Sequence, residues 1–325
     1  MPSLFNVADV VAALVALVLL LRWLASGDGA ARGGISKHDR GWWHSPLATA
    51  EEAEVVAQAA QLVREKLRDG VTIDPHVELL ALRRLRAVRF GRHAGEQVPA
   101  AADAERVADS CVWAIEWRAD NCPKLESRGP TKSSWYAAVE LPQGEWADHF
   151  MAVGMRTGRA RGGHPVKVER CGRHDTAGLE RDPEGEARLR KYYYGMLEDM
   201  QHTLDVESLA CGALLRTYEV WDMAGITVGQ LLSPTVLRVS ISVLKIFSKA
   251  FTGITARVCI INMPAWAVRL LDPLLAAVPA HVRSRVVVLG ADWEPTVAQD
   301  VDAEALSLIK ADASTLARHR GTRLY

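Results

Sequence analysis

The side chains that could perform bond-making chemistry in this sequence are few and scattered. Asp222, Glu219, Lys167 and a histidine would supply general acids and bases if the fold brought them together. The chain lacks the GxSxG, GxxxxGK(S/T), GxGxxG and HExxH motifs of nucleophile, phosphate, dinucleotide and zinc sites. Because Asp222 precedes Gly225, capping a turn is a simpler role for its carboxylate than catalysis. We therefore expect no catalytic residues and no enzyme activity.

The cysteines and histidines do not form a recognisable metal site. The five cysteines include no CxxC pair, and the ten histidines are dispersed along the chain. We expect no metal and no cofactor, and we expect reduced thiols, which are typical of cytosolic proteins. The 39 basic residues balance the 39 acidic residues, so no net charge favours a nucleic-acid partner.

Three short runs of β-branched residues indicate buried strands, and they alternate with two longer segments of helical character. The runs are Thr217–Trp221, Val258–Ile261 and Val286–Leu289, and the segments between them are Pro234–Phe251 and Pro264–Val278. Continuous apolar runs of this length need cover on both faces, and connections of this length fit crossover helices. Together they predict an α/β protein built on a largely parallel sheet.

Further elements are expected on the N-terminal side of these strands. They are a glycine-rich hairpin over Phe150–Arg156 and Val166–Arg170, a helix over Ala187–Leu209, and earlier helices from Thr49 to Gly70, Asp74 to Val88 and Ala101 to Arg118. The early helices predict a small helical domain. A basic run in the second of them, formed by Arg83, Arg84, Arg86, Arg89 and Arg92, is expected to be a solvated helix face.

The first 25 residues are unusually apolar. Val10–Leu21 has no polar side chain, and a membrane-spanning helix of roughly 20 residues fits if Asp9 and Arg22 lie near the two interfaces. No Lys or Arg precedes this run, whereas several basic residues follow it, which by the positive-inside rule places the rest of the chain in the cytosol. We expect an uncleaved membrane anchor. The alternatives are a cleaved signal, which would make the protein secretory, and a helix packed on a soluble cytoplasmic protein.

The segment Pro264–Val278 is more apolar than a surface helix needs to be. Its polar positions, Arg269 and Asp272, occupy one narrow face, whereas an ordinary surface helix carries an apolar stripe of roughly 100°. Deep burial is the simplest explanation, and contact with a lipid or a membrane is the functional one. Pro273 should break or kink the helix after Leu271, and such a break can serve as a hinge.

At these segments the chain resembles the CRAL-TRIO family of lipid-binding and lipid-transfer proteins over most of Asp74–Gly321. The matching stretches are 79–90 for the family's LLRFLRARKF helix, 114–118 for EWR, 163–175 for GRPVxxxRxGxxD, 220–225 for xxDxxG, 260–264 for IINxP, 285–290 for KIxxLG and 315–321 for LPxxxGG. Each motif is weak by itself, and their common order and spacing carry the resemblance.

The resemblance implies a helical N-terminal bundle beside a mixed sheet, with an apolar pocket for one lipid and a mobile helix that closes it. In this chain the closing helix would be Pro264–Val278. The resemblance also places the headgroup positions of phosphoinositide-handling members at Val88, Gly253 and Arg285. Only Arg285 keeps its charge, so phosphatidylinositol specificity is not implied.

On this basis we assign a lipid headgroup to Arg285, with Thr217 and Glu219 beside it. The lipid cavity and its gate are expected to be formed by Trp221, Phe247, Phe251, Trp266, Leu270 and Leu274. The expected domains are an anchor over residues 1–25, a flexible tether over 26–48, a helical domain over 49–122 and a lipid-binding domain over 145–325. Each methylene group of a lipid tail that leaves water contributes ~0.8 kcal/mol, which favours an apolar cavity as its site.

The preferred hypothesis is a protein that binds one hydrophobic lipid, of phospholipid or isoprenoid type, and transfers or presents it at a membrane. Its expected partners are a lipid and a membrane surface, and no nucleic acid. A second hypothesis is a regulatory or interaction module with the same fold and a filled, non-exchanging pocket. An enzyme of unknown class is the third.

Overall fold

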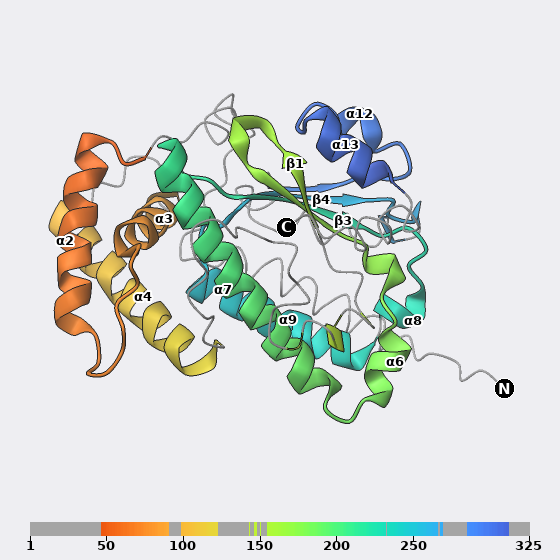
Figure 1. The fold of residues 1–325 in the computed structure, drawn as a ribbon, viewed down its shortest axis with the longest axis horizontal. Coiled ribbons are helices and arrows are strands. Elements are labelled where there is room, and N and C mark those ends of the chain that lie inside the picture. Colours follow the sequence, from red (N-terminus) through yellow and green to blue (C-terminus); the bar gives the residue numbers. More distant parts are fainter. Residues whose placement is uncertain are drawn as a thin grey trace.

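A five-stranded sheet with helices on both faces forms the centre of the molecule (Figure 1). The computed structural model describes residues 47–90, 99–122, 143, 146–147, 150, 155–231, 233–265, 267–268 and 285–311. An N-terminal bundle of helices precedes the sheet and consists of α2 (Ala50–Lys66), α3 (Val77–Phe90) and α4 (Ala100–Asn121). The predicted class, a helical bundle followed by a mixed and largely parallel sheet, is confirmed.

The strands lie in the sheet in the order in which they occur in the sequence. They are β1 (Met155–Arg159), β2 (Pro165–Glu169), β3 (Thr217–Asp222), β4 (Thr255–Ile261) and β5 (Val286–Val288). β1 is antiparallel to β2, and every later pair is parallel. The three predicted strands that alternate with helical segments are therefore neighbours in one parallel array.

The first strand of the hairpin differs from its predicted position. The predicted position is Phe150–Arg156, but Phe150 is helical and the strand is Met155–Arg159. The reason is that Gly158 belongs to the strand and not to the connection. The connection is a tight turn over Arg161–Gly163, in which two adjacent glycines take positive φ angles of 74° and 80°.

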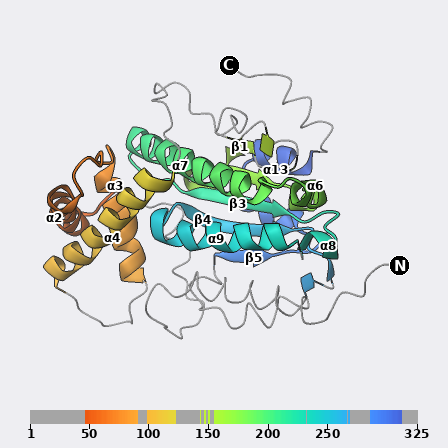
Figure 2. The same ribbon diagram turned by 90° about the horizontal axis from the view of Figure 1, so that it is seen from below.

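Helices and short helical turns connect the strands and cover both faces of the sheet. They are η2 (Arg161–Gly163), η3 (Cys171–Arg173), α6 (Thr176–Arg181), α7 (Gly185–Cys211), α8 (Val228–Leu231), α9 (Pro234–Ala250), α12 (Glu294–Val297) and α13 (Ala303–Lys310). α7 and α9 run side by side beneath the sheet, and α12 and α13 lie on its other face (Figures 1 and 2).

Local capping explains where several of these helices begin and end. Thr49 precedes α2, where its Oγ1 accepts a hydrogen bond from Glu52 N and its own N donates to Glu52 Oε2. Ser233 Oγ accepts a bond from Val236 N at the start of α9. Gly212 ends α7 in the left-handed conformation, with φ 68°.

The two faces of β2 and β3 carry different side chains because successive residues of a strand point in opposite directions. Val166, Val168, Tyr218 and Val220 face α12 and α13, and they form a buried apolar cluster with residues of those helices. The alternate residues of the same strands, which include Lys167, Glu169, Thr217 and Glu219, point toward the face that α7 and α9 cover. This second face is polar as well as buried.

Two arginines of α3 join the N-terminal bundle to the rest of the protein, which corrects the prediction of a solvated basic face. Arg83 is 1% exposed, and its Nη2 lies 2.8 Å from Asp205 Oδ1 of α7. Arg84 is 3% exposed and donates to backbone carbonyls at the end of α9. The prediction is wrong for these two residues because their guanidinium groups cross the interface and satisfy groups on other helices. Arg92 lies outside the described residues.

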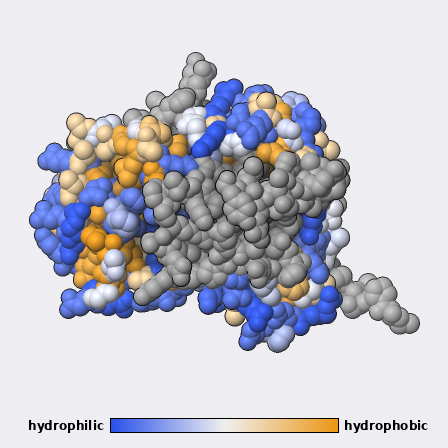
Figure 3. All heavy atoms as spheres, in the orientation of Figure 1, coloured by the Kyte–Doolittle hydropathy of each residue, from blue (hydrophilic) through white to orange (hydrophobic). Residues whose placement is uncertain are grey.

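Apolar side chains gather over the N-terminal bundle on the face shown in Figure 3. None of the helices in the described part of the chain combines the length and the apolar character that a membrane-spanning helix needs. The expected anchor, Val10–Leu21, and most of the expected broken helix, Pro264–Val278, lie outside the described residues.

The close approach of η3 to the turn after β3 leads to a stability prediction. A Cβ atom at Gly172 would lie 2.1 Å from Ala224 O and 2.8 Å from Ile226 N, and both of these are backbone atoms. We expect Gly172→Ala to lower the free energy of unfolding by about 1–3 kcal/mol, as overpacking does. Urea denaturation followed by circular dichroism measures this change.

Gly229→Ala is the matched control, because the nearest atom to its added Cβ is Thr227 Oγ1 at 3.9 Å. We expect this variant to be as stable as the wild type or slightly more stable. Equal stability of the Gly172→Ala variant and the wild type would contradict the close packing of η3.

Candidate functional site

A strand-end network of Arg170, Asp222 and Asn262 joins the carboxyl ends of β2, β3 and β4. Arg170 Nη1 lies 2.7 Å from Asp222 Oδ2, and Asn262 Nδ2 donates to Asp222 Oδ1 at 2.8 Å. Arg170 Nη2 also donates to three backbone carbonyls at the end of α13. Asp222 Oδ1 accepts a bond from Ala224 N, which is the capping role expected from the sequence. The network holds the strand ends and α13 together.

A second network, the sheet-face network, lies on the face of the sheet that α7 and α9 cover. Lys167 of β2 lies between two carboxylates: its Nζ is 3.2 Å from Glu169 Oε2 and 3.6 Å from Glu219 Oε2. All three side chains are buried. One ammonium and two carboxylates leave one negative charge in excess, in a place where solvent screens charge poorly.

Hydroxyl and indole groups complete the bonding of Glu219. Its Oε1 accepts from Thr255 Oγ1 at 2.7 Å and from Thr217 Oγ1 at 3.2 Å. Trp221 Nε1 donates to Glu219 Oε2 at 3.3 Å. Two of the predicted headgroup residues, Thr217 and Glu219, therefore lie together, with the predicted cavity residue Trp221 beside them.

The balance of burial and charge keeps Lys167 and Glu169 ionised. Burial raises the pKa of the Glu169 carboxyl, but the positive charges of Lys167 and His174 and the hydrogen bonds from Lys167 and Tyr193 outweigh burial and hold this pKa below its usual value. Burial lowers the pKa of Lys167, but the charges of Glu169 and Glu219 raise it above its usual value. Each charge in the network thus depends on the others.

The third predicted headgroup residue, Arg285, belongs to a different and basic part of the molecule. Burial, followed by neighbouring guanidinium groups that include Arg83 and Arg285, lowers the pKa of Arg216 to about 9. Burial also lowers the pKa of Arg285 to about 10. Arg216 Nε and Arg83 Nη1 both donate to Gly253 O, at 3.2 and 3.3 Å. Arg83, Arg216 and Arg285 therefore form a basic cluster near the amino ends of the parallel strands.

Two other positions that the resemblance implies are apolar here, and one of them has a clear backbone role. Gly253 has a positive φ of 79° in the turn after α9, and a Cβ there would lie 3.3 Å from Arg83 Cβ. A glycine suits this position because L side chains rarely adopt such a φ. Val88 is half-buried on α3.

The predicted cavity residues that the structure describes lie in two places. Phe251 is fully buried, with the Arg118 guanidinium 5.6 Å from its ring centroid, and Phe247 packs against the same core between α4, α7 and α9. Trp221 packs instead against a cluster that contains Met263 and Ala267. The remaining predicted cavity and gate residues, Trp266, Leu270 and Leu274, lie outside the described residues.

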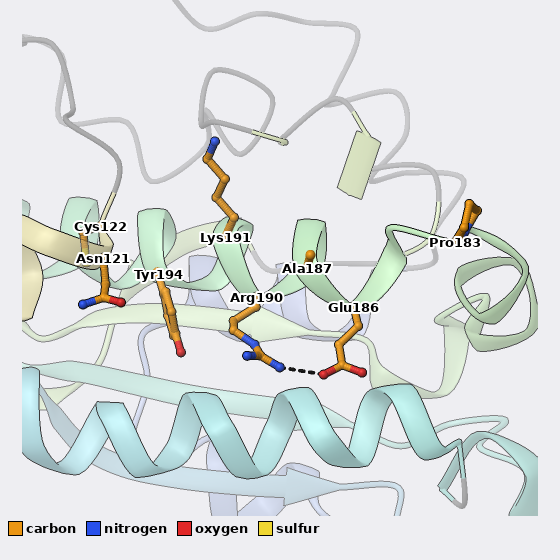
Figure 4. A pocket seen from close by; sticks show the side chains of 8 residues that line it. All are labelled: Asn121, Cys122, Pro183, Glu186, Ala187, Arg190, Lys191 and Tyr194. Carbon is orange, nitrogen blue, oxygen red and sulfur yellow. Dashed lines mark hydrogen bonds and ion pairs between the residues drawn. The ribbon is translucent and has the colours of Figure 1, made fainter.

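A hollow of about 600 Å³ lies beside α7 (Figure 4). It is lined by Asn121, Cys122, Pro183, Glu186, Ala187, Arg190, Lys191 and Tyr194. Arg190 and Tyr194 point from α7 toward α9 in Figure 4, and Arg190 Nη2 lies 2.6 Å from Glu186 Oε1. The volume suits a small ligand, but none of the predicted site residues lines this hollow.

Several residues of the networks and of the basic cluster were not predicted as site residues, among them Glu169 and Arg216. Alternation could have indicated Glu169, because Lys167 and Glu169 are two residues apart in one strand and must share a face. Arg216 carries no such signal, since it meets the basic cluster only through tertiary contacts. Of the cluster considered for an enzyme, Lys167 and Glu219 meet, whereas Asp222 bonds to Arg170 and Asn262 in the strand-end network.

The charge balance of the sheet-face network predicts the effect of replacing Lys167 with methionine. Removing one partner of a buried ion pair typically costs ~3–5 kcal/mol, because an uncompensated charge stays buried. We expect a loss of about this size in the free energy of unfolding at neutral pH, measured by urea denaturation. Lys310→Met removes an exposed pairing with Glu294 and should cost less than about 1 kcal/mol.

The pH dependence of stability should also change sign in the Lys167→Met variant. In the wild type the pKa of Glu169 is lowered, so its stabilising contribution is present above the unfolded pKa and is lost as the pH falls through the folded pKa. Without Lys167, burial should raise this pKa, so stability should fall as the pH rises through the carboxyl range. Parallel pH profiles of wild type and variant would contradict the assigned role of Lys167.

Comparison with known proteins identifies the part of the chain that contains these networks. Residues 151–307 match the family model of the CRAL/TRIO domain. Among solved structures, the chain is similar to the "Crystal structure of Sfh5", with 13% sequence identity, a TM-score of 0.45 and coverage of 96% of this chain and 91% of that chain. No curated protein matches the chain. The family predicted from the motifs is confirmed for this part of the chain: residues 151–307 form a CRAL/TRIO domain.

Proposed function

We propose that this protein binds a single hydrophobic lipid in its CRAL-TRIO domain and transfers or presents it at a membrane. The match of residues 151–307 to the CRAL/TRIO domain, which is typical of lipid-binding and lipid-transfer proteins, supports the general activity. The observation that carries the proposal to specific residues is the basic cluster of Arg83, Arg216 and Arg285, which gathers buried guanidinium groups near Gly253.

We propose that Arg285 holds an anionic headgroup, such as a phosphate or a carboxylate, with Arg216 behind it. Burial disfavours the protonated guanidinium groups of Arg216 and Arg285, as their lowered pKa values indicate, and like charges add to this effect at Arg216. An anion beside them would reverse this penalty and form charge-assisted hydrogen bonds. Thr217 and Glu219 stay candidate headgroup contacts, and their bonds to Thr255 and Lys167 would then be shared with the lipid.

We propose that the lipid tail lies against Phe247, Phe251 and Trp221, and that Trp266, Leu270 and Leu274 form the gate. Apolar packing around α7 and α9 supports the placement at Phe247 and Phe251, and the separate cluster of Met263 and Ala267 supports the placement at Trp221. The gate and the N-terminal anchor over residues 1–25 are supported by the sequence alone. The anchor would hold the lipid-binding domain at the cytosolic side of a membrane.

Mass spectrometry of an organic extract of the purified full-length chain tests the proposal, together with lipid transfer between donor and acceptor vesicles. We expect one lipid per chain and measurable transfer. Arg285→Gln should lower the transfer rate of an anionic phospholipid by roughly tenfold or more, since a hydrogen bond to a charged group contributes ~1.5–3 kcal/mol.

Arg238→Gln is the matched control for Arg285→Gln. Arg238 is exposed on α9 and pairs with Glu186, so its loss should leave transfer unchanged. An extract without stoichiometric lipid, together with no transfer by the wild type, would count against lipid transfer. A loss of equal size in both variants would count against a specific role for Arg285.

A regulatory module with a filled pocket is the second candidate function, and the sheet-face network favours it. Lys167, Glu169 and Glu219 occupy the inner face of the sheet and satisfy one another there. A lipid would have to compete with these bonds or lie beyond them. Absence of lipid from a folded wild-type protein is the result that this candidate predicts.

A further inference from the structure

Three potential metal ligands lie together at the carboxyl end of β2. Glu169 is the last residue of this strand, Cys171 opens the short turn η3, and His174 follows the turn. One ligand atom from each residue lies within 4.8 Å of the other two, and His174 Nε2 is 3.8 Å from Glu169 Oε1. Small side-chain rotations would bring all three atoms within coordination distance of one cation.

The imidazole of His174 has a ring nitrogen that is not satisfied by the surrounding residues that the structure describes. Its side chain is 7% exposed, and its Nε2 is buried with no hydrogen-bond partner among the described residues. A buried polar atom without a partner is rare in folded proteins and calls for an explanation. An imidazole nitrogen is a common ligand of transition metals, so a cation is one partner that would satisfy it.

The buried groups around the cluster carry an excess of negative charge that a cation would offset. Lys167 balances only one of the two buried carboxylates of Glu169 and Glu219. A thiol that coordinates a divalent cation is deprotonated and so adds one negative charge. With a thiolate and a divalent cation, the charges of the cluster would sum to zero.

We propose that Glu169, Cys171 and His174 bind a transition-metal cation of the Zn²⁺ type. A thiolate, an imidazole nitrogen and a carboxylate oxygen are the donor atoms that Zn²⁺ and Co²⁺ accept. Lys167 contacts Glu169 Oε2, so the cation would face Oε1, which accepts a hydrogen bond from Tyr193 and lies 3.8 Å from His174 Nε2. Binding forms a metal–sulfur bond and releases the thiol proton to solvent, with no change of oxidation state.

The fourth coordination position would be open to water or to the hydroxyl of Tyr193. Tyr193 Oη lies 3.0 Å from Glu169 Oε1, the same oxygen that would face the cation. Cys171 also packs against the apolar cluster that contains Met263 and Ala267. An occupied site would therefore join the end of β2 to α7 and to the start of the segment that follows β4. The site does not depend on the proposed lipid function.

The sequence contains a signal for this cluster that the expectation of no metal site overlooked. Glu169, Cys171 and His174 follow a Glu-x-Cys-x-x-His spacing. Such a spacing is too short to specify a structural zinc site by itself, because the usual sites combine two such pairs from separate segments. Only the turn of η3 and the burial of His174 bring the three side chains to one point.

Metal titration of the full-length protein tests the proposal. The protein is stripped with a chelator and dialysed against Co²⁺ or Zn²⁺, and bound metal is measured by elemental analysis. We expect one equivalent per chain, release of one proton, and thiolate-to-cobalt charge-transfer absorption in the near ultraviolet. Cys171→Ser should abolish this absorption, and His174→Gln should weaken Co²⁺ binding by about tenfold or more.

Cys211→Ser and His202→Gln are matched controls, because both residues are exposed and distant from the cluster in sequence. They should keep one equivalent of metal and the charge-transfer band, and circular dichroism should confirm that every variant is folded. Failure of the wild type to retain one equivalent would overturn the proposal. Retention of the full cobalt spectrum by the Cys171→Ser variant would overturn it as well, since binding would then be adventitious.

Discussion

The ion pair between Arg170 and Asp222 ties the carboxyl ends of β2 and β3 to each other and to the end of α13. Both side chains are buried, so the cost of removing their charges from water is offset only while each keeps its partners. Asn262 adds the end of β4, and its φ of 54° is a left-handed conformation that asparagine tolerates. Glu169 and Cys171 flank Arg170 in the sequence, and Glu219 precedes Asp222 in β3, so the ion pair holds the segments that carry them.

Charge is distributed unevenly along the parallel strands. The basic cluster of Arg83, Arg216 and Arg285 lies at their amino ends, whereas the excess negative charge of the sheet-face network lies farther along β2 and β3. A ligand with an anionic headgroup would therefore be oriented by the field of the protein as well as by contacts. A cation beside Glu169 would reduce the negative end of this field and so reduce the contrast between the two ends.

Buried arginines decide how the N-terminal bundle meets the CRAL-TRIO domain. Arg83 bonds to Asp205 and to the carbonyl groups of Leu215 and Gly253, and Arg84 bonds to carbonyl groups at the end of α9. These contacts place a guanidinium group of the bundle within the basic cluster. The bundle thus contributes a residue, Arg83, to the candidate site. The packing of the bundle against the sheet therefore affects the positive charge around a bound headgroup.

The sequence by itself determined the elements whose signals are local. Thr49 with Glu52, Ser233 with Pro234, and the β-branched runs after Thr217, Thr255 and Arg285 specify helix starts and buried strands through neighbours a few residues away. The family motifs could likewise be recognised from their order. Only the tertiary structure decided that Arg83 and Arg84 are buried, that Phe251 lies beneath Arg118, and that Glu219 of β3 lies beside Lys167 of β2. The physical reason is that a buried charge is stable only beside partners from distant segments, and neither composition nor periodicity specifies those partners.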